Sequence, residues 1–162
     1  MVDPGGFGTG LSHGRGLLRR WNADSMTKSI HAKEAILIVE NHPLLRLLLV
    51  GLVETAGFEA IQAGNADEAL PILECRSDIA LLVTSVVMDG SMDGVELAHA
   101  ADIRWPSVKI IVVSGKRGLM ESVLPRRSSF LAKPYHDEEM AFEIRSLLAR
   151  ELDRGVEIHL PA

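Results

Sequence analysis

The stretch Ile79-Ala-Leu-Leu-Val-Thr-Ser-Val-Val-Met-Asp-Gly-Ser-Met-Asp-Gly94 decides the fold of this chain. Its first residues are apolar and β-branched enough for a buried strand, whereas residues 89–94 have the composition of a turn. An amphipathic segment then begins at Val95. The stretch therefore predicts a strand, a loop and a helix. Ser85 falls at the tip of the strand, where open α/β sheets usually place their ligands.

The same alternation of apolar strands and amphipathic helices extends in both directions along the chain. The expected strands are residues 35–39, 58–63, 79–85, 108–113 and 129–132, and the expected helices are 44–56, 66–75, 95–103, 116–123 and a last helix that Asp137 caps and that ends at about residue 152. Strands that alternate with helices favour parallel pairing through right-handed crossovers. The predicted fold is a three-layer α/β/α sandwich around a doubly wound, five-stranded parallel sheet.

Composition and charge indicate how the chain is organised. Its 162 residues, 47% of them hydrophobic, suit one domain of ordinary size. Residues 1–33 are rich in glycine and hold five basic and two acidic residues, so they carry +3 and the remainder carries −8 of the total −5. We expect a disordered basic tail at 1–33, a domain at 34–152 and a short tail at 153–162. An acidic domain lacks the basic patch that nucleic acids require.

Cysteine usage and hydropathy predict a cytoplasmic protein. Cys75 is the single cysteine, so no intramolecular disulfide can form and a reducing compartment is the natural environment. Cys75 falls on a helix, and we expect it to face the core. No apolar run approaches the length of a membrane span, and the first residues lack the apolar segment of a signal peptide.

Polar residues follow four of the expected strands. Glu40 and Asn41 follow the first strand, Ser85 ends the third, Ser114 follows the fourth and Lys133 follows the fifth. Because the carboxyl ends of parallel strands lie along one edge, these side chains should form a polar pocket. The structural alternative is that the two serines satisfy backbone groups at the strand ends and that the lysine has a purely structural partner.

Five motifs resemble the response-regulator receiver domains of two-component signalling. They are Ile-Leu-Ile-Val-Glu-Asn-His-Pro-Leu-Leu-Arg46, Val-Thr-Ser-Val-Val-Met88, Met-Asp-Gly94, Val-Val-Ser-Gly115 and Phe-Leu-Ala-Lys-Pro134. The resemblance covers residues 34–152, in order and at near-standard spacings. It implies a flavodoxin-like sheet of order 2-1-3-4-5. It also implies a role in phosphorelay signal transduction.

The family's chemistry is altered at its central position. Receivers take a phosphoryl group from a kinase phosphohistidine onto an aspartate, which corresponds here to Ser85, and an unactivated serine hydroxyl is a poor nucleophile. The acidic pair becomes Glu40 and Asn41. The resemblance places a magnesium site at Glu40, Asn41 and Val87, which we expect to be weak or absent because too few carboxylates remain. No other cofactor is expected.

Other family positions are retained. Ser114 matches the hydroxyl residue that contacts the phosphoryl group, Lys133 the salt-bridging lysine and Phe130 the switching aromatic residue. Without the aspartate, we expect Lys133 to pair with Glu40 and to hold the pocket in one fixed state. Asp89 is a candidate substitute acceptor, with a solvated loop carboxylate as the plainer interpretation.

These features predict a non-enzymatic, single-domain protein of the response-regulator type, a phosphorylation-independent pseudo-receiver that acts by protein contacts. The expected partner is a sensor histidine kinase or another signalling protein. The resemblance marks the face formed by residues 108–113, 116–123, 129–132 and 137–152 as the family's output and dimer surface. Candidate contacts on this face are Leu119, Val123, Phe130, Tyr135 and Phe142.

Three alternatives remain open. The first is a phosphorelay receiver that uses a different acceptor residue, and the second is a structural or decoy module. The third is a small α/β hydrolase with Ser85 as nucleophile. The hydrolase is disfavoured because valines and a threonine flank Ser85 in place of the Gly-x-Ser-x-Gly elbow.

Overall fold

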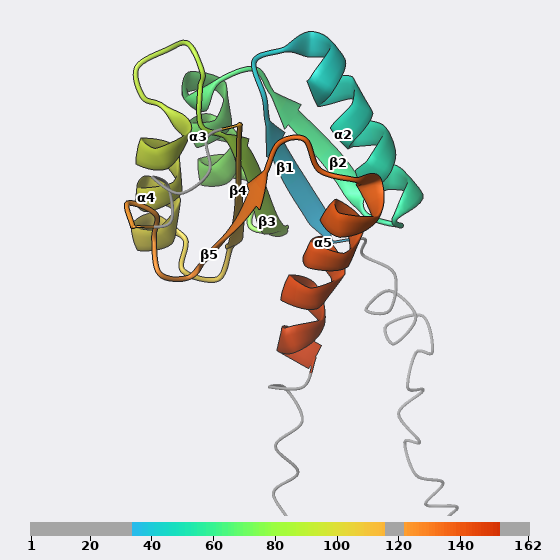
Figure 1. Ribbon diagram of the computed structural model, residues 1–162. Helices are drawn as coiled ribbons and strands as arrows, with labels where there is room; N and C mark the ends of the chain where they lie inside the picture. Colours follow the sequence, from blue (N-terminus) through green and yellow to red (C-terminus); the bar gives the residue numbers. More distant parts are fainter. Residues whose placement is uncertain (1–33, 116–121, 153–162) are drawn as a thin grey trace, which may run out of the picture. The chain divides into compact units, whose positions relative to one another are not determined.

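The computed structural model describes residues 34–115 and 122–152, which form an α/β fold (Figure 1). The elements are β1 Ala35–Val39, α2 Pro43–Thr55, β2 Glu59–Ala63, α3 Ala66–Cys75, β3 Ile79–Ser85, α4 Gly94–Arg104, β4 Lys109–Ser114, β5 Ser128–Ala132 and α5 Asp137–Leu152. The strands pair in parallel in the order β2-β1-β3-β4-β5. The predicted doubly wound sheet and its order are therefore confirmed.

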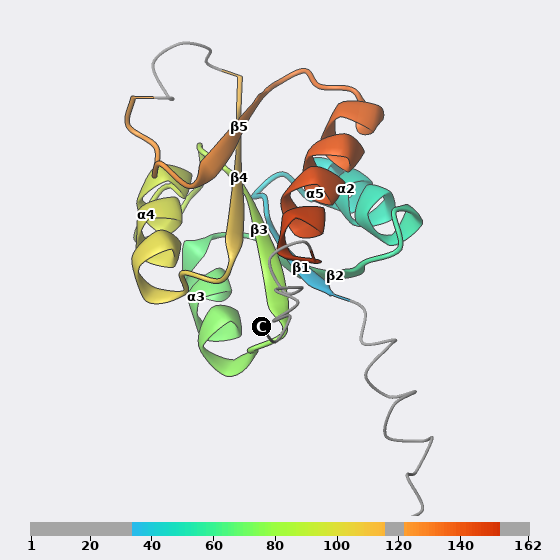
Figure 2. The same ribbon diagram turned by 90° about the horizontal axis from the view of Figure 1, so that it is seen from below.

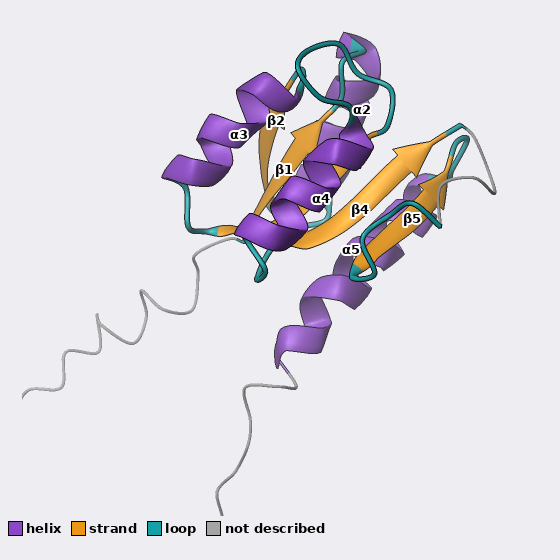
Figure 3. Ribbon diagram, turned by 90° about the vertical axis from the view of Figure 1, so that its left-hand side faces the viewer, coloured by secondary structure: helices purple, strands orange, loops and turns teal. Residues whose placement is uncertain are grey.

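Helices cover both faces of the sheet, with α2 and α5 on one face and α3 and α4 on the other (Figures 2 and 3). Successive residues of a strand point to opposite faces, so Ile36 and Ile38 pack beneath α2 and α5 whereas Leu37 and Val39 pack beneath α3 and α4. All five residues of β1 are buried. This explains why the central strands are continuous apolar runs rather than alternating ones.

Local capping sets the helix boundaries. Pro43 begins α2, and the Asn65 side chain accepts a hydrogen bond of 3.0 Å from the Glu68 N–H at the start of α3. Asp93 and Glu96 form a capping box, so α4 begins at Gly94, one residue before the predicted start. Asp137 was expected to cap the last helix but is its first residue. Glu139 instead accepts from the His136 N–H at 2.9 Å.

One sequence expectation is wrong, and others concern residues largely outside the described ranges. Cys75 is exposed rather than buried, because it ends α3 at the rim of the domain. The helix predicted at 116–123 lies largely outside the described residues, and its last two residues, 122 and 123, form a turn. The predicted tails, 1–33 and 153–162, also lie outside the described residues. Within residues 34–115 and 122–152, no helix is long and apolar enough to cross a membrane.

The loop between β3 and α4 is fixed at two points. Gly94 donates its N–H to the Val86 carbonyl at 2.9 Å, and a Cβ added to Gly94 would lie only 1.8 Å from the Ser85 carbonyl oxygen. The start of α4 thus presses directly on the backbone of Ser85. Farther along the loop, the Ser91 N–H and hydroxyl donate to the Asp67 carboxylate on α3. The tip of β3 is therefore held by α4, and its loop by α3.

Candidate functional site

Residues from four strand ends surround one cavity of about 220 Å³ at the carboxyl edge of the sheet. Its lining includes Glu40, Asn41, His42, Leu45, Ser85, Val86, Val87, Val113, Ser114, Gly115 and Lys133. The structure thus brings together the polar residues that the sequence placed at this edge. Phe130 and Asp89 do not line the cavity. Phe130 is half-buried on β5, and Asp89 is exposed in the loop.

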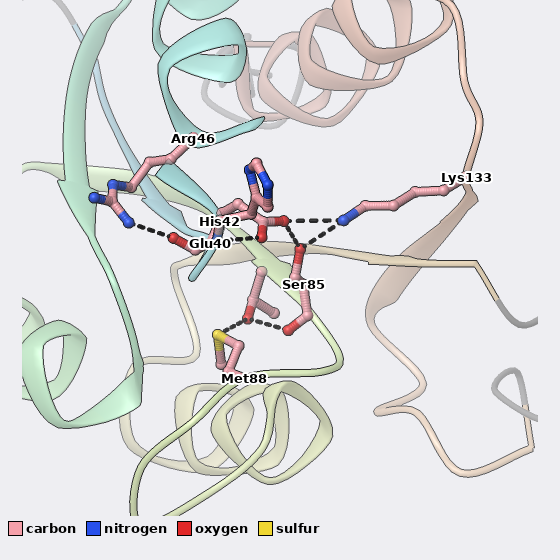
Figure 4. A network of polar contacts seen from close by, with 7 residues as sticks. Glu40, His42, Arg46, Ser85, Met88 and Lys133 are labelled. Atoms are coloured by element: carbon pink, nitrogen blue, oxygen red, sulfur yellow. Dashed lines mark hydrogen bonds and ion pairs between the residues drawn. The ribbon is translucent and has the colours of Figure 1, made fainter. Parts of the chain in front are cut away.

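Glu40, Ser85 and Lys133 form a closed polar network (Figure 4). The Lys133 ammonium lies 2.9 Å from Glu40 Oε2 and donates to Ser85 Oγ at 3.0 Å. The Ser85 hydroxyl donates to the same Glu40 oxygen. The His42 N–H donates to the other carboxylate oxygen, Oε1, at 2.9 Å. The ion pair that the sequence predicted between Lys133 and Glu40 is therefore present, and the serine hydroxyl hydrogen-bonds to both of its members.

The carboxylate of this network is buried, whereas its lysine is partly exposed. The Glu40 side chain is 2% exposed and that of Lys133 is 29% exposed. Burial alone would raise the pKa of Glu40, but the hydrogen bonds from Ser85, the His42 N–H and Lys133, together with the charge of Lys133, lower it below its ordinary value. Glu40 is consequently ionised at neutral pH, and the cation that neutralises it belongs to the same chain.

The Ser85 hydroxyl behaves differently from the structural alternative. The Ser85 hydroxyl bonds to side chains, whereas the neighbouring Thr84 hydroxyl takes the backbone bond, donating to the Ser85 carbonyl at 3.0 Å. For Ser85 the strand-end alternative is thus wrong. Ser114 is buried, and its carbonyl accepts from the Lys133 N–H at 2.8 Å. That bond aligns the end of β5 with β4 and fixes the backbone from which Lys133 extends.

The donor set at this edge does not fit a magnesium ion. Magnesium prefers charged oxygen ligands, and Glu40 is the one carboxylate in the cavity lining. Its charge is already matched by Lys133 at 2.9 Å. Val87 and Asn41, the other positions that the resemblance suggests, are both exposed. Across the part of the chain that the structure describes, no three His, Cys, Asp or Glu side chains gather as a metal site.

The structure also shows a feature that the sequence interpretation missed, the leucine face of α2. This face consists of Leu44, Leu45, Leu47 and Leu48, whose exposed fractions range from 40% to 63%. A helix against a sheet buries one stripe, and apolar residues at five of the six positions from 44 to 49 exceed what one stripe can bury. This excess of apolar residues was the sequence signal that could have revealed the leucine face.

A groove runs between α2 and α5, beside the leucine face. It consists of two adjoining cavities of about 280 and 420 Å³ that share Leu48, Leu52 and Asp137 in their linings. Lys133 and Tyr135 line the first cavity. Burial, with the nearby charges of Glu40 and Asp137, raises the pKa of Tyr135 to about 12, so this phenol stays neutral.

The contact residues predicted on the family's output surface are only partly prominent. Val123 and Phe142 are exposed at 48% and 69%, and Phe130 and Tyr135 are half-buried. Leu119 lies outside the described residues. The richest cluster of exposed apolar side chains on the described residues is therefore the leucine face of α2.

Comparisons with known proteins agree with this architecture. Residues 36–145 match the response regulator receiver domain family. The chain is 33% identical over 116 residues to the response regulator receiver protein CpdR of Brucella abortus (strain 2308), covering 70% of this chain and 95% of that protein. It is 28% identical over 120 residues to the sensor kinase CckA of the same strain, covering 72% of this chain but 13% of the kinase.

Solved structures give the same result. The receiver domain of the hybrid histidine kinase CckA superposes with a TM-score of 0.60 at 28% identity, covering 70% of this chain and 98% of that domain. A receiver protein from Sinorhizobium medicae WSM419 superposes with a TM-score of 0.68 at 21% identity, covering 73% and 96%, which supports the fold alone. The chain belongs to the response regulator receiver domain family of two-component signalling.

Proposed function

We propose that this chain is a pseudo-receiver, a receiver domain that acts by protein contacts without being phosphorylated. The observation that carries the proposal is the closed network of Glu40, Ser85 and Lys133. In this network Lys133 is already paired with the Glu40 carboxylate of the same chain. A phosphorylated receiver instead pairs this lysine with its phosphorylated acceptor residue. The pocket accordingly has no unmatched charge for a phosphoryl group to satisfy.

The chemistry of Ser85 supports the same proposal. A serine becomes a nucleophile when a neighbouring base can take its proton. Glu40 receives the hydroxyl hydrogen bond, but its lowered pKa makes it a weak base. Lys133 donates hydrogen bonds to both Glu40 and Ser85, so it does not accept the hydroxyl proton in Glu40's place. The same argument weighs against a hydrolase that uses Ser85.

The proposed partner is a sensor histidine kinase or another signalling protein. The support is the relationship to CpdR and to the receiver region of the kinase CckA. A receiver fold with a pocket in one fixed state could still bind such a partner, and it would do so regardless of the partner's phosphorylation. This distinguishes it from a phosphorelay component, whose binding changes with the phosphoryl group.

Intact-protein mass after incubation with acetyl phosphate and magnesium tests the proposal. Wild type should gain nothing, whereas a Ser85→Asp variant, studied alone and together with Asn41→Asp, should gain one phosphoryl group of about 80 Da. The same samples then give the partner test, in which wild type binds a histidine kinase equally before and after kinase autophosphorylation. A phosphoryl group on wild type would sink the proposal, with Asp89 the first residue to map.

A further inference from the structure

We infer that the leucine face of α2 and the adjoining α2–α5 groove form the interface of a homodimer. The occupant of the groove is a second copy of this chain, related by a twofold axis. The groove shares Leu45 and Lys133 with the polar pocket, but its lining contains neither Ser85 nor Glu40 and neither Val123 nor Phe142.

The first argument is that the leucine face is apolar and uncharged. Four leucines in the first turns of α2 are exposed, a cluster of the kind that marks an interface. The charged residues of this helix are Arg46 and Glu54. Arg46 is turned away, because it donates to the Glu40 carbonyl at 2.7 Å and to Gln62 at 3.4 Å. Two such faces can therefore meet without opposing like charges.

The second argument is Gly51, which lies inside α2 and lines the groove. Glycine is unfavourable within a helix relative to alanine. Nothing among the described residues requires a glycine here, since a Cβ added to Gly51 would meet none of their atoms within 4 Å. A residue that lacks a side chain on an exposed helix lets another helix approach its backbone closely. Gly51 thus marks the point at which the helix of a second copy would cross α2.

The third argument is the charge pattern of α5 along the same groove. Asp137 and Glu138 line one end of the larger cavity and Arg145 lines the other. Glu138 and Arg145 are seven positions apart on α5, which corresponds to a rise of about 11 Å along the helix. In an antiparallel twofold arrangement, the acidic end of one copy faces the basic end of the other. The two copies in a twofold dimer contribute the same surface, so that surface must be complementary to itself. The charges along this groove meet that requirement.

The test is sedimentation equilibrium of the full chain over a range of concentrations. Wild type should populate a dimer, and Leu48→Gln, at a largely exposed position, should weaken it by about tenfold or more. Gly51→Ala should raise the unfolding midpoint of the monomer and yet weaken the dimer, a combination that a purely structural role cannot produce. Arg145→Glu should weaken the dimer, and Glu138→Arg with Arg145→Glu should restore it.

Matched controls separate this interface from others. Ile103→Gln replaces an even more exposed apolar residue, on α4, and should leave the dimer dissociation constant unchanged. Phe142→Gln tests the predicted output surface and should also leave the dimer dissociation constant unchanged. A monomer at every concentration would overturn the inference. So would a dimer that Phe142→Gln weakens and Leu48→Gln does not, or a charge exchange that fails to restore association.

Discussion

The substitution Gly94→Ala should destabilise the domain strongly, although alanine favours helices. The added Cβ would lie 1.8 Å from the Ser85 carbonyl oxygen, whereas side-chain carbons essentially never approach within 3.0 Å. The start of α4 must therefore move by at least the difference, 1.2 Å. Such a movement stretches the Gly94 N–H bond to the Val86 carbonyl and disturbs the packing of Leu97.

The magnitude follows from opposing effects. Overpacking against a rigid neighbour costs about 3 kcal/mol. The better helix propensity of alanine recovers about 1 kcal/mol at most. A net loss of about 2 kcal/mol corresponds to a fall of about 8 °C in the midpoint of thermal unfolding for a domain of this size. Urea unfolding followed by far-ultraviolet circular dichroism measures the same loss at constant temperature.

Gly51→Ala is the matched control, because the same atom is added where nothing lies within 4 Å. At concentrations where the monomer predominates, this variant should gain about 0.5–1 kcal/mol from helix propensity and from a less flexible unfolded chain. The two substitutions should thus have opposite signs. Equal stability of Gly94→Ala and wild type, or a shift of both variants in the same direction, would refute the close approach of α4 to Ser85.

The polar network supplies further predictions. Lys133→Met leaves the buried Glu40 carboxylate without its cation and should cost about 3 kcal/mol in urea unfolding; an unchanged midpoint would mean that the ion pair adds nothing. Ser85→Ala removes the hydroxyl's hydrogen bonds with Glu40 and Lys133 and should cost about 1.5 kcal/mol, less than Lys133→Met because the ion pair persists. Because folding lowers the pKa of Glu40, its contribution is complete above its ordinary value of 4.5 and is lost as the pH falls through the folded value. An acid titration of stability should therefore show a smaller loss below pH 4.5 in Lys133→Met, ending at a higher pH than in wild type, and coincident curves would contradict the role of Lys133.

The sequence was sufficient for the fold because its strands are short apolar runs with clear ends. Residues 79–85 and 66–75 were predicted with their observed bounds, since Ser85 and Asn65 interrupt the apolar pattern sharply. Boundaries set by side-chain caps were less accurate. Asp93 and Glu139 cap by reaching across a turn, so α4 and α5 were each misread by one residue at their start.

Tertiary features were harder to predict. The pairing of Lys133 with Glu40 was predicted because the family's aspartate is absent. The hydrogen bonds between the Ser85 hydroxyl and both residues depend on distances that spacing in the sequence does not give. Cys75 was misplaced because periodicity cannot tell a helix end at the rim from one over the sheet. The leucine face of α2 was visible as an excess of apolar residues, yet only the structure shows which of them the sheet leaves uncovered.

The ion pair between Lys133 and Glu40 has a consequence for any anion that approaches from solution. A counter-ion attached to the same chain is present at an effective concentration that can reach millimolar values or more, and it cannot diffuse away. A free phosphate or carboxylate must outcompete it at every encounter. A pseudo-receiver of the kind proposed above would therefore carry its signal through the number of copies present and the partners that they meet.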